Sequence, residues 1–177
     1  MTQSDVPMFG ERVRSWESVW SLEFPEEMDA LYRNDSDTKG MQRLRGLVIA
    51  QCVETETILG KIVKRLDQTI NIEGRTTGGL LEDARTLLGD EAKKWEKDLL
   101  LIGEAIECRN HTVHSCVTMG CSWADYATGD GGEWVPVSAM MGDEDYSESD
   151  LLCDLDLQQR ATVRAVHLLH SLGYTLE

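Results

Sequence analysis

Residues 95–117 read WEKDLLLIGEAIECRNHTVHSCV, and their pattern is that of a long helix. Every third or fourth residue falls on one stripe, which is the spacing of a helix with a buried face. The stripe runs through Trp95, Leu99, Ile102, Ile106, Arg109, Val113 and Val117. Burying an arginine in such a stripe costs free energy unless the charge is paired with a partner or binds a ligand. The pattern predicts a long helix from about Asp90 through Val117, with a charged position near its end.

Helical patterns also cover most of the surrounding sequence. A long helix is predicted from about Thr38 to Asn71, because its apolar and small positions recur at spacings of three and four. A shorter helix is predicted from about Leu80 to Leu88, and Gly89 is well placed to end it. Ser147 and Asp150 can cap a last helix that runs to about Leu172. These helices predict an all-α fold, a four-helix bundle.

Two additions to the bundle are expected. Residues 9–21 and 26–32 can form extra N-terminal helical turns. Residues 123–126 and 133–137 flank a glycine-rich turn at 129–132, which predicts a small β-hairpin inserted before the last helix. The length of 177 residues favours a single domain over residues 1–177, with a core at about 38–172.

Composition limits the function classes. Apolar residues make up 41% of the chain and charged residues 28%, as in globular proteins, and the formal net charge is −15. Such a chain repels nucleic acid over most of its surface, so RNA must be met at a local basic pocket or with a partner's help. The sequence lacks the roughly 20 consecutive apolar residues of a membrane span and the layout of a signal peptide, so we expect a cytoplasmic protein without membrane contact. Five cysteines without paired spacing predict free thiols.

The charged position of the long helix belongs to a group of polar residues. On a helix, Arg109 and His114 lie about 140° apart, and Asn110 lies between them, about 40° from His114. Histidine can give and take protons near neutral pH. Arginine presents a planar fork of donors that suits phosphate oxygens. With a polar amide, these groups form a minimal set for phosphodiester cleavage without a metal.

The segment RNHTVH, residues 109–114, resembles the motif of the HEPN superfamily. Its members carry an arginine, a polar residue directly after it, and a histidine four to six positions past the arginine, late in a long helix of a small bundle. Residues 47–50, which lead into Glu54 and Glu56, also resemble the opening helix of such bundles. The likeness covers about residues 38–172, and the motif is its specific part.

The resemblance implies a metal-independent endoribonuclease of a toxin–antitoxin, abortive-infection or other defence system, without a cofactor. His114 would be the general acid or base for attack of the ribose 2′-hydroxyl on the adjacent phosphate, which gives a cyclic phosphate. Arg109 would hold the phosphate, and Asn110 would orient the histidine or bind the phosphate. A homodimer with both motifs in one composite site is implied, which would explain an arginine in an apolar stripe. An antitoxin or other regulatory protein is a further implied partner.

One feature departs from the family pattern. In one subfamily a tyrosine two residues after the histidine is modified by its antitoxin, and Cys116 stands at that position here. The alternative function is a non-catalytic helical module that binds a protein partner or a nucleotide.

Several neighbouring residues allow more than one interpretation. His111 and Glu54 are candidates that assist the motif. For Glu54, the alternative interpretation is a residue on a solvated helix face. His111 could bind zinc together with other histidines and cysteines. Structural zinc sites have closely spaced pairs of ligands, which this sequence lacks, so no metal is predicted. Trp123 and Trp134 pack the hairpin or stack on a base. The acidic run 143–145 is a solvated loop or a contact for a basic partner.

Overall fold

The computed structural model describes residues 14–18, 36–115, 117–126, 129, 131–141 and 146–173. The chain divides into two compact units. Leu44–His114 and Asp150–Glu177 form the helical unit, and Met1–Arg43 and Ser115–Ser149 form the sheet unit. Most described residues are helical, which confirms the predicted predominance of helix. The single domain over residues 1–177 stays a prediction.

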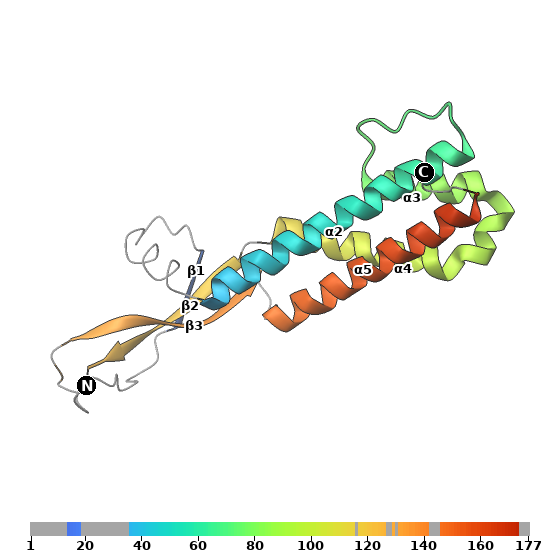
Figure 1. Ribbon diagram of the computed structural model, residues 1–177. Coiled ribbons are helices and arrows are strands. Elements are labelled where there is room, and N and C mark those ends of the chain that lie inside the picture. The colour runs from blue at the N-terminus through green and yellow to red at the C-terminus, as the bar shows by residue number, and fades with distance from the viewer. Residues whose placement is uncertain are drawn as a thin grey trace. The chain divides into compact units, whose positions relative to one another are not determined.

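A loop joins the first two helices, the next ones follow directly, and two strands stand between the last two (Figure 1). The helices are α2 (Ser36–Leu66), α3 (Thr77–Leu88), the 3₁₀ helix η1 (Gly89–Trp95), α4 (Glu96–His114) and α5 (Glu148–Ser171).

Local side-chain hydrogen bonds set two helix ends that differ from the predicted bounds. Helix α2 ends at Leu66 rather than near Asn71, because the Asp67 carboxylate accepts hydrogen bonds from the Thr69 amide and hydroxyl. Such bonds offer the backbone an alternative to the helix. Helix α3 begins at Thr77, since the Thr76 hydroxyl accepts from the Gly79 amide at 3.1 Å and caps it.

The helix predicted from about Asp90 through Val117 is shorter at both ends. Residues 89–95 form η1, in which Lys93 pairs with Asp90 at 2.9 Å and Lys94 pairs with Glu91 at 2.5 Å. Residues three apart eclipse one another in a 3₁₀ helix, so these pairs fit its period. At the other end, α4 stops at His114 and Val117 opens a strand.

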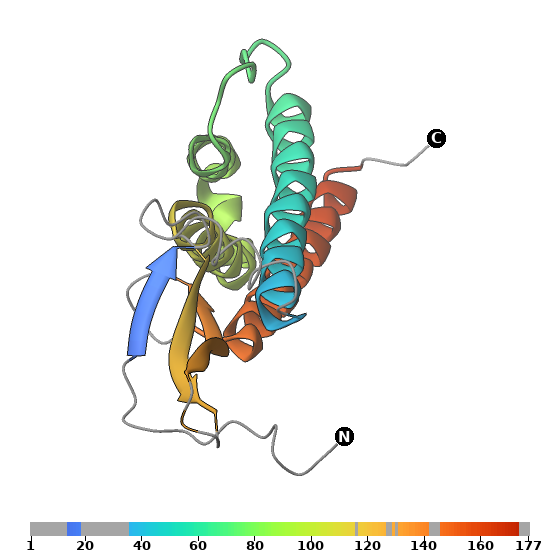
Figure 2. The same ribbon diagram turned by 90° about the vertical axis from the view of Figure 1, so that its left-hand side faces the viewer.

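Contacts between side chains fix the directions of the long helices. Gln51 near the middle of α2 bonds to Thr162 of α5, and Arg65 near its end bonds to Leu172, so α2 and α5 run parallel. Figures 1 and 2 both show these two helices side by side. Helix α4 runs the opposite way, because Arg45 near the start of α2 reaches residues 112 and 113.

The apolar core of the helical unit joins four helices. Leu59, Ile62 and Val63 of α2 meet buried residues of α3, α4 and α5. Its other members are Leu80, Leu81, Ala84, Leu88, Leu99, Ile102, Ala105, Ile106, Ala161, Ala165, Leu168 and Leu169. On α4 this cluster ends at Ile106, three residues before Arg109.

The sheet unit holds three antiparallel strands in the order β1-β2-β3. They are β1 (Arg14–Ser18), β2 (Val117–Asp125) and β3 (Gly132–Met141), and both pairs are antiparallel. The register between β2 and β3 shifts at Gly120/Cys121. Between them, the Tyr126 amide donates to the Gly131 carbonyl at 2.8 Å. Gly129 and Gly131 have φ values of 74° and 110°, which glycine adopts without strain.

The predicted helix over residues 9–21 is wrong in its centre, because residues 14–18 form β1 and pair with β2. A strand edge presents unpaired backbone groups, and an isolated short helix is marginal in water, so pairing with the edge is favoured over the apolar spacing. The expected turns at 26–32 and the acidic run 143–145 lie outside the described residues.

Leu99 and Leu100 provide a matched test of the core. Leu99 is 3% exposed and Leu100 is 54% exposed on the same helix. We expect Leu99→Ala to lower the free energy of unfolding by about 2–5 kcal/mol, through lost burial and a cavity. Leu100→Ala is expected to change it by less than about 1 kcal/mol. Urea unfolding of both variants measures this, and equal losses would contradict the packing described for α4.

Candidate functional site

The last turns of α4 carry the three residues of the predicted motif. Arg109 is half-buried, whereas Asn110 and His114 are exposed. Arg109 Nη1 donates to Asn110 Oδ1 at 3.1 Å, so the two neighbouring side chains are held together. The structure therefore places a guanidinium and an amide together, with the imidazole at the exposed end of the same helix.

The inner part of the Arg109 side chain is enclosed. Its Nε is shielded from solvent and has no hydrogen-bond partner among the described residues. A buried donor without a partner costs roughly 1–3 kcal/mol. Arg109 is therefore held with part of its hydrogen-bonding capacity unused.

The Arg109 guanidinium acts electrostatically on α2. Cys52 is buried, and burial raises the pKa of its thiol; the Arg109 charge opposes this rise and the Glu56 charge adds to it. Thr77, at the start of α3, donates a hydrogen bond to the Glu56 carboxylate. Glu54 is exposed. Of the two glutamates, it is thus Glu56 whose charge reaches the thiol that Arg109 also influences.

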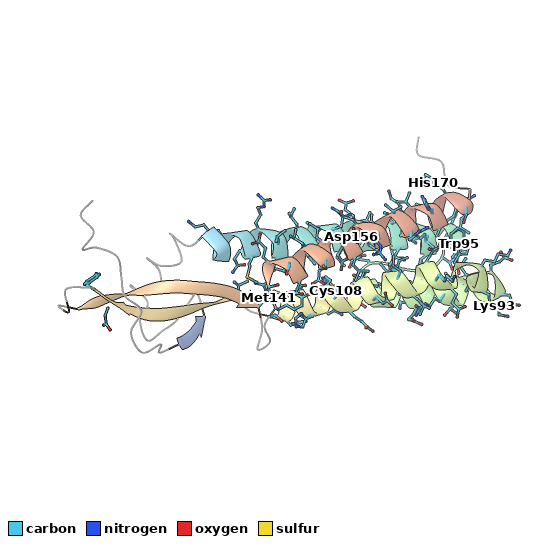
Figure 3. The ribbon with its side chains drawn as sticks, turned by 90° about the horizontal axis from the view of Figure 1, so that it is seen from below. Lys93, Trp95, Cys108, Met141, Asp156 and His170 are labelled. Atoms are coloured by element: carbon cyan, nitrogen blue, oxygen red, sulfur yellow. The ribbon has the colours of Figure 1, made fainter. Side chains whose placement is uncertain are left out.

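On the α5 side, α4 presents Cys108 (Figure 3). Burial raises the pKa of the Cys108 thiol to about 12, and a hydrogen bond to the Asp154 carboxylate adds to the rise. A hydrogen bond from Gln158 acts in the opposite direction. Gln158 is only 1% exposed, and its Nε2 donates to the Ala105 carbonyl at 2.5 Å. Cys108 is thus a protonated thiol packed between the helices.

Three polar side chains join α2 to α5 and form what we call the polar layer: Gln51 and Thr55 of α2 and Thr162 of α5. The Thr162 hydroxyl lies 2.9 Å from each of Gln51 Nε2 and Thr55 Oγ1, and it donates to the Gln158 carbonyl at 2.9 Å. With its proton on that carbonyl, it accepts from the other two. Gln158 Oε1 is buried without a partner among the described residues. The polar layer lies within the core, because Thr55 is buried and Thr162 stands between the core residues Ala161 and Ala165 along α5.

A second arginine holds the end of α4. Arg45 of α2 donates from Nε to the Thr112 carbonyl at 3.0 Å and from Nη2 to the Val113 carbonyl at 2.9 Å. The last four carbonyls of a helix have no partner within it, and a basic side chain can satisfy them. The sequence predicts a helix that includes Arg45, but it does not indicate that Arg45 binds the end of another helix.

The remaining candidates lie as follows. His111 is exposed on α4, and His167 and His170 are exposed on α5. Within the described part of the chain, no group of three or more histidine, cysteine, aspartate or glutamate side chains is placed to hold a metal ion. The side chains of Cys116, Cys121, Trp123 and Trp134 lie outside the described residues. Among the described helices, none combines the length and the apolar character of a membrane span.

A pocket of the helical unit lies away from the motif. This pocket of about 470 Å³ is lined by Lys93, Lys94, Glu96, Lys97, Asp98, Leu101 and Arg164. In Figure 3, Lys93 lies at the far end of the helices from Cys108. Arg164 pairs with Asp98 at 3.5 Å, and Lys93 and Lys94 pair within η1, so the charges largely compensate one another. The pocket therefore favours neither an anionic nor a cationic ligand.

Comparisons of the chain with protein-family models, with curated proteins and with solved structures found no match.

The thiols of Cys108 and Cys153 should differ in reactivity. With a pKa of about 12, the Cys108 thiol carries about one part in 10⁴ of reactive thiolate at pH 8, and it is shielded as well. Cys153 is exposed on α5. We expect iodoacetamide at pH 8 to alkylate Cys108 at least about a hundredfold more slowly than Cys153. Peptide mass spectrometry over time measures both rates, and comparable rates in the folded protein would contradict the packing around Cys108.

Proposed function

We propose that this chain is a metal-independent endoribonuclease of the HEPN type, acting as a toxin or as a defence effector. The observation that carries the proposal is the arrangement of the motif. Arg109 Nη1 and Asn110 Oδ1 are joined at 3.1 Å, and Asn110 and His114 are exposed on the last two turns of α4. The last two turns of α4 thus carry a guanidinium, an amide and an imidazole, the groups that the proposed reaction needs.

In the proposed reaction, each residue has a distinct task. His114 removes the proton of the ribose 2′-hydroxyl, whose oxygen then attacks the adjacent phosphorus. The P–O5′ bond breaks, the leaving 5′-oxygen takes a proton, and a 2′,3′-cyclic phosphate remains on the upstream fragment. Arg109 donates to the phosphate oxygens while their negative charge grows. Asn110 orients the Arg109 side chain through the hydrogen bond between them.

The spacing on α4 favours a site shared by two copies. Five residues separate Arg109 from His114, which puts them about 140° apart around the helix and about 7.5 Å along it. We propose a homodimer in which both motifs face one cleft, so that phosphate binding and proton transfer draw on two copies of α4. The half-buried Arg109, with its unused Nε, suits a position at the edge of such a cleft.

The finer architecture belongs to the same proposal. Helices α2, α3, α4 and α5 would be the four helices of a HEPN-like bundle, and their shared apolar core supports this assignment. Strands β2 and β3 would be a hairpin inserted between α4 and α5, in agreement with their place in the chain. We propose a cytoplasmic location and control by an antitoxin or another regulatory protein.

A second candidate function is a non-catalytic helical module that binds a protein partner or a nucleotide. It is favoured by the local surroundings of Arg109, whose charge acts on the buried Cys52. In that case Arg109 stabilises the helical unit instead of binding a phosphate. The two candidate functions differ in the effect that replacing Arg109 or His114 has on RNA cleavage.

Cleavage of single-stranded RNA in EDTA tests the proposal. We expect the parent chain to cut an RNA oligonucleotide and to leave its 2′-deoxy analogue intact, because the 2′-hydroxyl is the nucleophile. His114→Ala should lower kcat about 10²–10⁴-fold, the usual contribution of general acid–base catalysis. Arg109→Ala should lower it about 10²–10³-fold, as does loss of a donor to a transition-state oxyanion.

His170→Ala is the matched control, because His170 is an exposed histidine near the end of another helix, α5. It should cleave RNA like the parent. Cleavage by His114→Ala at the rate of the parent would overturn the assigned role. No cleavage by the parent, together with lower stability of Arg109→Ala, would favour the non-catalytic module.

A further inference from the structure

Arg45 lies outside the motif, yet it is bonded to the turn that carries His114. Nη2 of Arg45 donates to the Val113 carbonyl at 2.9 Å, and Nε donates to the Thr112 carbonyl at 3.0 Å. A peptide group is planar, and the Val113 carbonyl belongs to the plane that leads to the Cα of His114. The bond from Nη2 therefore holds the backbone of His114 itself.

The geometry of this contact is more restrictive than one hydrogen bond. Two nitrogens of one planar guanidinium bind two consecutive carbonyls, which fixes both the position and the rotation of the last turn. The positive charge also lies at the helix C-terminus, where the helix dipole favours a cation. Without such a partner, the last carbonyls would rely on water and the turn would fray.

We propose that Arg45 is a positioning residue, which keeps the last turn of α4, and with it His114, in a fixed place relative to Arg109. The inference rests on the proposed function for the importance of that placement. A proton acceptor displaced by about 1 Å can lose about two orders of magnitude in rate. Arg45 acts on the reaction only through His114 and touches no substrate.

The chain supplies a matched control on the same helix. Arg65 of α2 donates from Nε to the Leu172 carbonyl at 3.0 Å, next to the last residue of α5. It is also an arginine of α2 that bonds to a carbonyl at the end of a neighbouring helix, but it lies far along α2 from Arg45. Arg65→Ala therefore removes the same kind of bond away from the motif.

Amide hydrogen exchange of the full chain, followed by NMR, tests the positioning without reference to activity. In Arg45→Ala we expect the amides of Val113 and His114 to exchange at least about tenfold faster relative to the amide of Ile102, because two charge-assisted hydrogen bonds are lost. In Arg65→Ala these ratios should stay within about twofold, while the end of α5 exchanges faster. The ratio to Ile102 removes any general loss of stability.

Arg45→Lys gives a second variant if Arg45→Ala does not fold. It keeps the charge but can make only part of the bidentate contact, so its exchange ratios should fall between those of the parent and Arg45→Ala. Unchanged ratios at Val113 and His114 in both Arg45 variants would overturn the proposal.

RNA cleavage is the second readout. Arg45→Ala should lower kcat at least about tenfold with little change in KM, Arg45→Lys should recover part of it, and Arg65→Ala should match the parent. Full kcat in an Arg45 variant whose α4 end has loosened would overturn the role of the placement. A parent chain that cleaves no RNA would refute the ribonuclease proposal, whereas the exchange ratios would still decide whether Arg45 holds the turn.

Discussion

A charged residue, Arg109, lies half-buried on α4, on the side that faces Cys52 of α2, and this constrains how the end of α4 can pack. A guanidinium cannot join an apolar core without partners, and here the apolar cluster of α4 ends at Ile106. On α2, Cys52 is buried within reach of the Arg109 charge. The polar layer of Gln51, Thr55 and Thr162 joins α2 to α5. The price of this arrangement is two buried polar atoms, Arg109 Nε and Gln158 Oε1, without partners among the described residues.

The same constraint separates the motif into an inner and an outer part. Arg109 is half-buried and bonded to Asn110, whereas His114 is exposed five residues later. An exposed residue at a helix end is normally the least ordered part of the helix. Arg45 offsets this tendency by binding the Thr112 and Val113 carbonyls. One arginine thus belongs to the motif itself, and another binds the backbone of the turn that carries the histidine.

The periodic parts of the fold could be predicted from the sequence, and the parts set by single contacts could not. The stripes of α2, α4 and α5 repeat over many turns, so their existence was visible, and Gly89 was correctly placed at the end of α3. Helix α2 ends early because of one carboxylate, that of Asp67, and such a local bond leaves little trace in periodicity. Val117 continues the stripe of α4 but belongs to β2, and Arg14–Ser18 pairs with that strand from a distance of about a hundred residues along the chain. Long-range pairing of this kind overrides local spacing.

The candidate site shows the same division. The motif residues were found from their order in the sequence, which the chemistry of each side chain supports. The sequence favours Glu54 over Glu56 and does not distinguish Arg45 from its neighbours, because the contacts of these residues depend on which helix lies opposite. Glu54 and Glu56 are two residues apart and point about 160° apart on α2, so only the packing of α3 shows that Glu56 bonds to Thr77.

We propose that Arg109 and His114 cleave RNA through the 2′-hydroxyl without a metal. The most direct measurement is the chemical identity of the new RNA ends, determined by mass spectrometry after incubation of the parent chain with an RNA oligonucleotide in EDTA. We expect a 2′,3′-cyclic phosphate on one fragment and a free 5′-hydroxyl on the other. A 5′-phosphate with a 3′-hydroxyl, or cleavage that stops when EDTA is added, would contradict it.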